Sequence, residues 1–429
     1  MKIQLLYLML SFLVFCANAQ EPITKSFLKS ITKDVKKLSS DKMEGRETGT
    51  KGEAKAADYI AKRMESLYLK PYGIGGYFQE FTFTPKKNPH SHSQETSENL
   101  EPITGKNVIG YLDNGAEYTI VIGAHYDHLG FGGEGSLAAR STEVHNGADD
   151  NASGVAGVLY LAQLLRGSNY KKNNYLFIAF SGEEKGLWGS KSFVNNPTIP
   201  LAKINYMINM DMIGRLDSNK LAINGTGTSP AWKDVIAVTN NRKCLNPHVQ
   251  DSVKPEDNIF NLVLGESGIG PSDHTSFYLK EIPVLAFFTG QHSDYHKPSD
   301  DFEKVNIDGV RRIGNFIFKL VWKADSLGKL EYLKTKGDSQ TKAPRFKVTL
   351  GVMSDYMFQG EGMRIDGTIP ERPAEKAGLK SGDVVIQIGD VRVADMQSYM
   401  TALSQFEPGD KTKVKAKREG QEMEFELEF

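Results

Sequence analysis

The sequence predicts an α/β protein, in which a mostly parallel mixed sheet is sandwiched by helices and followed by a small β-rich domain. Short apolar runs alternate with helical stretches from residue 106 onward, which is typical of strands joined by crossover helices. Residues 333–345 are polar with almost nothing to bury, as in a linker. Residues 346–429 then combine short strand-like runs with glycine turns. A chain of 429 residues is long enough for two domains of unequal size.

Residues 1–19 have the pattern of a secretory signal peptide. Lys2 supplies the positive start, residues 3–16 are almost unbroken apolar, and residues 17–19 give a small-x-small cleavage pattern. The apolar run is short for a membrane span, and an uncleaved anchor is the alternative. We expect an exported protein, periplasmic or secreted, whose mature chain has no membrane span.

Charge and cysteine content exclude several classes of protein. Lys plus Arg number 52 and Asp plus Glu 53, so the formal net charge is -1. This balance lacks the basic excess of a nucleic-acid-binding protein, and no nucleic-acid partner is expected. Only two cysteines are present. Cys16 lies in the leader, which leaves Cys244 without an internal disulfide partner.

The first domain is expected over residues 20–332. It begins with helical stretches within residues 24–70, the second of which runs from about residue 52 to residue 68 after a loop at 41–46. A polar loop is expected at residues 86–99. Buried strands are predicted over residues 108–112, 118–124, 175–180, 204–210 and 283–288, and helices over residues 152–165, 231–240 and 310–324.

Acidic and imidazole side chains lie just beyond the predicted strands or just before a helix. Because the carboxyl ends of strands in an open α/β sheet form its binding crevice, five chain segments would deliver these groups to one edge. Imidazole and carboxylate are expected ligands of zinc and similar divalent metals. Their number favours two metals with a bridging carboxylate. The residues are His125, Asp127, Asp149, Asp150, Glu183, Glu184, Asp211, His292, Asp294, Tyr295 and His296.

The charge balance agrees with two divalent ions. Asp150, Glu184 and Asp211 supply three negative charges, and a bridging hydroxide would supply the fourth, so a dry pocket could hold the neutral centre. Paired metals about 3.5–4 Å apart generate hydroxide and polarise a carbonyl. Capping of a helix by Asp149 and Asp150 is the alternative for that segment. Consecutive acids and a glutamate pair in one crevice would nevertheless repel one another without a cation.

Two adjacent glutamates can divide the chemistry between them. Neighbouring residues at a strand end point in different directions, so one of Glu183 and Glu184 can bind metal while the other acts as general base. The spacing alone leaves open which does which. Asp127 lies two residues after His125, on the same side if the strand continues, and could orient that imidazole.

The combined segments resemble the M28 family of zinc peptidases over about residues 30–325. This resemblance implies a zinc-exopeptidase fold. The family includes secreted bacterial aminopeptidases, carboxypeptidases, glutaminyl cyclases and non-catalytic receptor domains. The resemblance is carried by Gly123-Ala124-His125-Tyr126-Asp127-His128, Asn146-Gly147-Ala148-Asp149-Asp150-Asn151-Ala152-Ser153-Gly154, Ser181-Gly182-Glu183-Glu184, Asn209-Met210-Asp211-Met212-Ile213-Gly214 and Tyr295-His296-Lys297-Pro298-Ser299-Asp300.

The resemblance also implies a role for each matching residue. Asp150 would bridge two zinc ions, and the other metal ligands would be His125, Asp211, Glu184 and His296. Glu183 would be the general base that activates the bridging water and passes its proton to the leaving amine. Asp127 would support His125. Tyr295 would either donate a hydrogen bond to the oxyanion or serve only in packing. His274, in a loop that lines the cleft, would contact the substrate.

Residues 346–429 resemble a PDZ domain of the bacterial protease type. The matching segments are Thr349-Leu350-Gly351-Val352 and the run Ala374 to Asp390, with Ala377-Gly378-Leu379 followed by Gly382-Asp383. The resemblance implies that the backbone of Leu350, Gly351 and Val352 cradles a peptide C-terminus while an edge strand pairs with the peptide. A packing module that binds no peptide is the alternative.

Together these observations predict a secreted di-zinc exopeptidase that acts on peptide substrates and removes N-terminal residues. Its attacking group would be a metal-bridging hydroxide, with Glu183 as general base. A carboxypeptidase or amidohydrolase with the same metal centre is a second hypothesis. A PDZ-type binding or scaffold protein with structural metals is a third, although structural zinc sites are closed and leave no spare acid.

Overall fold

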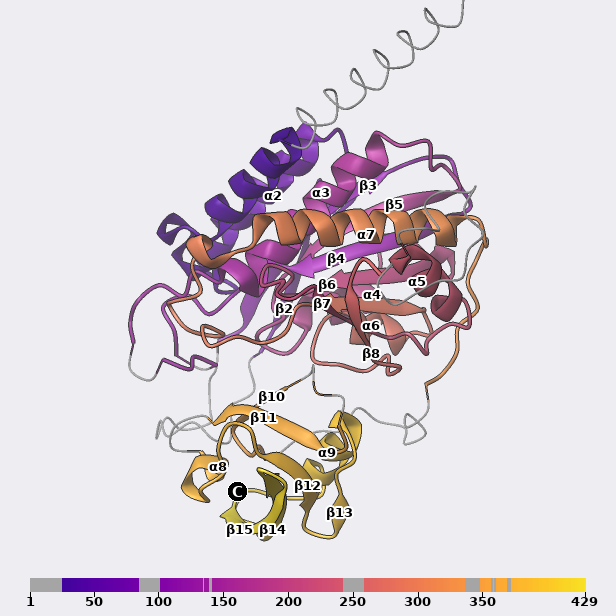
Figure 1. Ribbon diagram of the computed structural model, residues 1–429. Helices are drawn as coiled ribbons and strands as arrows, with labels where there is room; N and C mark the ends of the chain where they lie inside the picture. The colour runs from indigo at the N-terminus through magenta and orange to yellow at the C-terminus, as the bar shows by residue number, and fades with distance from the viewer. Residues whose placement is uncertain are drawn as a thin grey trace, which may run out of the picture.

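The computed structural model describes residues 25–335 and 348–429, with gaps at 85–100, 134, 139–140, 242–257, 356–357, 359 and 369–371. The predicted leader, the polar segment 86–99 and most of the predicted linker 333–345 therefore lie outside the described residues. Figure 1 shows a large α/β region, with the C-terminal β-rich unit beside it.

The large region is built on a nine-stranded mixed sheet with the order β1-β3-β5-β4-β6-β9-β7-β8, in which β2 also pairs with β3. Its centre, β5-β4-β6-β9, is parallel, while β3 and β7 flank that centre in antiparallel pairings. The predicted fold class is confirmed. The strands are β1 (Lys70–Pro71), β2 (Phe78–Phe83), β3 (Ile103–Leu112), β4 (Tyr118–His125), β5 (Asn173–Phe180), β6 (Ile204–Met210), β7 (Lys220–Asn224), β8 (Asn261–Leu264) and β9 (Val284–Phe288).

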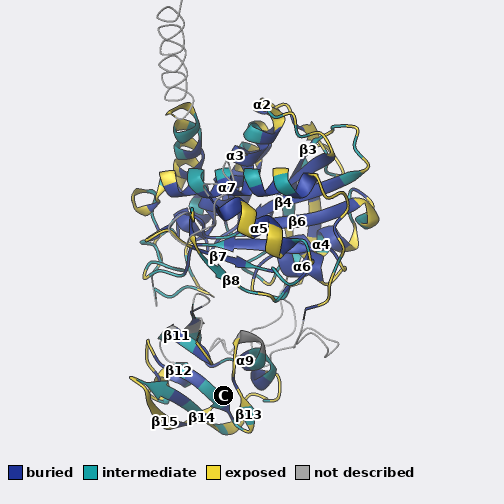
Figure 2. Cartoon of the chain, turned by 45° about the vertical axis from the view of Figure 1, so that its right-hand side comes forward, coloured by how far each residue is buried: buried dark blue, intermediate teal, exposed yellow. Residues whose placement is uncertain are grey.

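Helices cover both faces of this sheet. Alternate residues of the central strands point to opposite faces. Ile120 and Ile122 join the core beneath α2, α3, α5 and α7, whereas Val121 joins the core beneath α4 and α6. The central strands β5 and β6 are buried throughout (Figure 2). Besides a helix over residues 25–38, the helices are α2 (Lys51–Ser66), α3 (Gly154–Arg166), α4 (Trp188–Asn195), α5 (Trp232–Asn240), α6 (His274–Tyr278) and α7 (Ile307–Asp325).

Short helical turns connect several of these elements. The predicted loop at residues 41–46 is a 3-10 turn, η1 (Asp41–Arg46), in which Glu44 and Gly45 adopt left-handed backbone angles. The segment before α3 is the π-helical turn η2 (Ala148–Ser153). Two further 3-10 turns are η3 (Leu201–Lys203) and η6 (Phe302–Lys304). None of the helices in the described part of the chain combines the length and apolar character that crossing a membrane requires.

The C-terminal unit has a separate hydrophobic core. Its six-stranded sheet runs β10-β11-β12-β14-β15, with β13 paired to β12. Asp383 and Arg418 form a bidentate ion pair, with N–O distances of 2.7 Å, that ties β14 to the turn before β12. The elements are β10 (Val352–Ser354), β11 (Met363–Thr368), α8 (Pro373–Lys376), β12 (Val384–Ile388), β13 (Val391–Arg392), α9 (Met396–Leu403), β14 (Lys411–Arg418) and β15 (Gln421–Glu428).

Candidate active site

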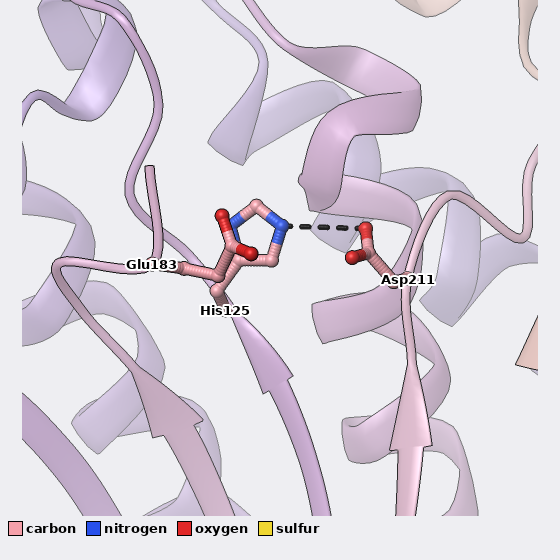
Figure 3. A group of neighbouring side chains, drawn as sticks. All are labelled: His125, Glu183 and Asp211. Atoms are coloured by element: carbon pink, nitrogen blue, oxygen red, sulfur yellow. Dashed lines mark hydrogen bonds and ion pairs between the residues drawn. The ribbon is translucent and has the colours of Figure 1, made fainter. Parts of the chain in front are cut away.

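The ends of the central parallel strands bring the predicted residues together. His125 is the last residue of β4, and Asp211 directly follows β6. Glu183 and Glu184 follow β5 after a turn in which Gly182 has a φ of 70°. Asp150 lies in η2, at the entrance to α3. Figure 3 shows His125, Glu183 and Asp211 converging from three neighbouring segments.

The carboxylate of Asp150 lies between two imidazoles. Its Oδ1 atom is 3.3 Å from Nε2 of His125, and its Oδ2 atom is 3.2 Å from Nε2 of His296. Nε2 of His296 is also 3.2 Å from Oε2 of Glu184, and Nε2 of His125 is 3.3 Å from Oδ1 of Asp211. Each oxygen of Asp150 therefore faces a different pair of potential ligands.

Two overlapping groups of donor atoms could each hold a metal ion. One group consists of His125, Asp150 and Glu184, and the other of His125, Glu183 and Asp211, with the donor atoms of each group within 4.8 Å of one another. His296 lies against Asp150 and Glu184. Imidazole nitrogens and carboxylate oxygens at this spacing suit zinc.

The other ring nitrogen of each imidazole is held by a backbone carbonyl. Nδ1 of His125 is 3.2 Å from the carbonyl oxygen of Asp127, and Nδ1 of His296 is 2.8 Å from that of Gly135. Such bonds fix the ring and leave Nε2 as the free ligand atom. The Asp127 carboxylate is farther from His125, at 3.7 Å, and instead accepts the N–H of Glu183 at 3.2 Å.

The negative charges of the carboxylates in this cluster favour the binding of a cation. In the described part of the chain, the ion-pair partners of Asp150, Glu184 and Asp211 are histidines. Although burial acts against its ionisation, the neighbouring histidines hold the pKa of Asp150 well below its usual range. Burial likewise opposes ionisation of Glu184, but His296 and His128 lower its pKa to about 2. The lowered pKa values of Asp150 and Glu184 favour their ionised forms, which are the forms that bind a divalent metal ion.

The pKa of Glu183 moves in the opposite direction. Burial is the largest cause, and the charges of Glu184, Asp211 and Asp273 add to it, so that the pKa lies well above the usual carboxyl range. His125 acts against this rise. The pKa of Glu183 is thus raised while that of the adjacent Glu184 is lowered. This difference is expected when one glutamate binds a cation and the other transfers protons.

Sequence reasoning assigned no role to His128, although it lies in the same segment as His125. His128 is buried, and its Nδ1 atom is 2.9 Å from Oε1 of Glu184. It therefore fixes the second oxygen of Glu184, whose Oε2 atom faces His296. The sequence feature that could have identified His128 is its position three residues after His125, just beyond the end of a strand.

Arg46 is a second residue that sequence reasoning missed. Its fully buried guanidinium donates hydrogen bonds of 2.6–2.9 Å to four backbone carbonyls, and burial lowers its pKa to about 10. The accepting residues are Leu38, Tyr126, Asn146 and Gly147. This one side chain joins the N-terminal helix to the loops that carry His125 and Asp150.

Asp300 positions the Asp149–Asp150 segment from the other side. One of its carboxylate oxygens accepts the N–H groups of both Asp149 and Asp150, at 2.9 and 3.0 Å. The other accepts a hydrogen bond from Arg215 at 2.9 Å. His292, which the sequence placed at this crevice, is bonded to Asp149 at 3.1 Å. Asp149 and His292 therefore support the loop of Asp150 from behind.

Thr48 links the N-terminal loop to the strand ends. Its hydroxyl donates to Oδ2 of Asp127 at 2.9 Å and accepts the N–H of Gly182 at 3.1 Å. Oδ1 of Asp127 accepts the N–H of Glu183. Thr48 and Asp127 together thus fix the turn that presents Glu183, and both contacts of Thr48 are buried.

Thr48→Val is expected to lower the free energy of unfolding by about 1–3 kcal/mol, because it leaves buried polar groups of Asp127 and Gly182 without a partner. Urea denaturation of the full chain measures this effect. Thr82→Val is the matched control, since the Thr82 hydroxyl bonds Thr104 at an exposed position. Equal stability of the two variants would contradict the role given to Thr48.

A cavity of about 360 Å³ opens onto the cluster, a volume within the range of small-molecule sites. Tyr295 lines it and stacks on His296 with ring centroids 3.8 Å apart. His274 also lines the cavity; it is buried, neither ring nitrogen has a hydrogen-bond partner in the described structure, and burial lowers its pKa to about 4. Burial therefore favours the neutral imidazole of His274.

The predicted peptide-binding residues lie at the start of the C-terminal unit. Leu350 is buried in its core, and its carbonyl accepts the N–H of Ala374 at 2.8 Å. Gly351 has a φ of 72°, and its N–H donates to the Thr349 hydroxyl at 3.0 Å. A carboxylate bound at this turn would have to displace that internal bond. Val352 begins β10.

Imidazole and carboxylate groups gathered at the strand ends of this mixed sheet form a candidate metal site of the kind that metallohydrolases use. A family model described as peptidase family M28 matches residues 107–321, and a PDZ domain model matches residues 352–429. The chain therefore belongs to peptidase family M28 and carries a C-terminal PDZ domain.

Similar proteins agree with this assignment. The uncharacterized protein YfbL of Escherichia coli is 28% identical over 254 residues, which cover 54% of this chain and 76% of YfbL. Aminopeptidase YwaD of Bacillus subtilis is 25% identical over 245 residues, covering 54% of this chain but only 46% of YwaD. A solved Zn-dependent exopeptidase from Parabacteroides distasonis has a TM-score of 0.53 at 16% identity, covering 69% of this chain and 97% of that structure, and shows the shared fold.

Proposed function

We propose that the chain is an exported aminopeptidase that holds two zinc ions and removes residues from the free N-terminus of peptides. The position of Asp150, with one carboxylate oxygen toward His125 and the other toward His296, supports a two-metal centre. His125 and Asp211 would complete one site, and Glu184 and His296 the other. Two zinc ions bound there would activate a water and polarise the scissile carbonyl.

The residues around the cavity would then handle protons and developing charge. Glu183 takes the proton of the attacking water and delivers it to the leaving amine, a role that suits a carboxyl group with a raised pKa. The Tyr295 hydroxyl donates a hydrogen bond to the oxyanion that develops on the scissile carbonyl. Asp127 and Thr48 keep the Glu183 backbone in place.

The charge of the cavity favours an N-terminal substrate over a C-terminal one. Among the described residues that line it are Asp150, Glu183, Glu184 and Asp211, but no lysine or arginine. A carboxypeptidase needs a cation to hold the terminal carboxylate, and arginine is the usual choice. The name of the relative YwaD also supports aminopeptidase activity.

A peptide panel tests this proposal. Peptides with free N-termini are expected to lose their first residue, whereas the same peptides with acetylated N-termini are expected to remain intact. A chelator should abolish the hydrolysis and added zinc should restore it. Mass spectrometry of the products identifies the released residue. Cleavage of the acetylated set, release from the C-terminus, or cyclisation of an N-terminal glutamine without hydrolysis would each overturn the proposal.

A further inference from the structure

The cavity at the metal ligands is not built by the catalytic domain alone. Val352 and Ser354, both in β10 of the PDZ domain, line the same cavity as His125, Glu183 and His296. The two domains have separate hydrophobic cores, so this shared lining is not a by-product of one continuous core. Figure 1 shows β10 and β11 as the PDZ strands closest to the catalytic domain.

The local structure of β10 suits a wall that contacts a ligand. Val352 and Ser354 are two positions apart, as are residues on one face of a strand. The pairing with β11 shifts in register between Met353 and Ser354, and the extra residue, at position 366, lies on β11, so the alternation of side chains along β10 is kept. In the described structure, β10 pairs only with β11 and lies at the edge of its sheet.

The chemistry of this wall suits contact with a peptide. Valine and serine carry no charge, and a valine cannot ligate a metal or transfer a proton. They offer an apolar surface and a single hydroxyl instead, which match the side chains and backbone of a peptide. Val352 and Ser354 line the cavity that also holds the proposed catalytic residues. A ligand that contacts these two side chains is therefore part of the substrate bound in that cavity.

We propose that β10 of the PDZ domain forms part of the substrate cleft, and that Val352 and Ser354 contact the peptide beyond its cleaved residue. This inference rests on the proposed aminopeptidase function. The N-terminal residue of the substrate would lie at the proposed metal ligands, and the rest of the peptide must leave past another wall. The PDZ domain is therefore a determinant of specificity for extended peptides, acting inside the active site.

Val352→Trp tests this proposal by narrowing the cleft on the PDZ side. The ratio of kcat/KM for a pentapeptide to kcat/KM for an aminoacyl p-nitroanilide is expected to fall about tenfold. Val391→Trp is the matched control, because Val391 is also a half-buried valine packed on the PDZ core but does not line the cavity. Ser354→Gln is a second, milder variant that should lower the ratio in the same direction.

A binding measurement separates this inference from the proposed function. A pentapeptide with a fluorescent C-terminal lysine is titrated into Glu183→Gln protein, with and without Val352→Trp or Val391→Trp, and its anisotropy is recorded. We expect Val352→Trp alone to weaken binding about tenfold. Equal affinities in the two double variants, or an equal loss of pentapeptide and p-nitroanilide turnover, would overturn the role of β10. Absence of hydrolysis by the wild-type chain would instead overturn the aminopeptidase assignment, while the titration would still report on β10.

Discussion

Glu183→Gln is expected to lower kcat by about 10²–10⁴-fold, the range typical of lost general acid–base catalysis. The amide keeps the size of the side chain and leaves the N–H of Glu183 free to bond Asp127. It can no longer accept the proton of the attacking water. KM for a peptide should change far less than kcat, because substrate contacts elsewhere in the cavity remain.

Metal content distinguishes this effect from the loss of a ligand. Glu183→Gln protein should retain the zinc content of the wild type, measured by elemental analysis after dialysis. Glu117→Gln, an exposed glutamate outside the cavity, is the control for the substitution itself. Full activity in Glu183→Gln, or loss of an ion, would contradict the role of Glu183 as general base.

Asp150→Ala is expected to lose both zinc ions and all measurable turnover. Its two carboxylate oxygens face the two histidines of different sites, so one truncation removes a ligand from each. Asp211→Ala is the matched comparison, because Asp211 contacts only the His125 side of the cluster. That variant should lose one ion and keep the other.

Zinc stoichiometry and circular dichroism together test this difference. Asp150→Ala protein should remain folded, since truncation also removes one carboxylate from a cluster of like charges. An Asp150→Ala protein that retains two ions, or that retains one exactly as Asp211→Ala does, would refute the bridging position of Asp150.

The sequence predicted the fold class and the meeting of the strand-end side chains, because both depend on local patterns. Apolar runs marked the central strands, and Asp211 and His125 were recognisable as strand-end residues without any knowledge of the tertiary structure. The pairing of Asp150 with two different histidines was expected only through the family resemblance. The structure was needed to find the order of the strands in the sheet and the difference in pKa between Glu183 and Glu184. Both depend on contacts between distant segments of the chain.

Other features left no pattern in the sequence. The buried guanidinium of Arg46 bonds carbonyls as far as 101 residues away, and Thr48 bonds a carboxylate 79 residues away. Neither follows a periodic or spaced motif, so burial and partners are needed to recognise them. Strand β2 was also missed, because it lies at the side of the sheet and alternates buried with exposed residues. The approach of β10 to the catalytic cavity depends on how two domains meet.

The buried Arg46 has a consequence for how this enzyme can be shortened. The residues matched by the peptidase family model begin at 107, so a chain trimmed to that match would lack Arg46 and the helix whose carbonyl it binds. The carbonyls of Tyr126, Asn146 and Gly147 would then lose their shared donor at the base of the catalytic loops. We therefore expect a chain shortened in this way to hold the loops of His125 and Asp150 less firmly than a chain that keeps Arg46 and the helix over residues 25–38.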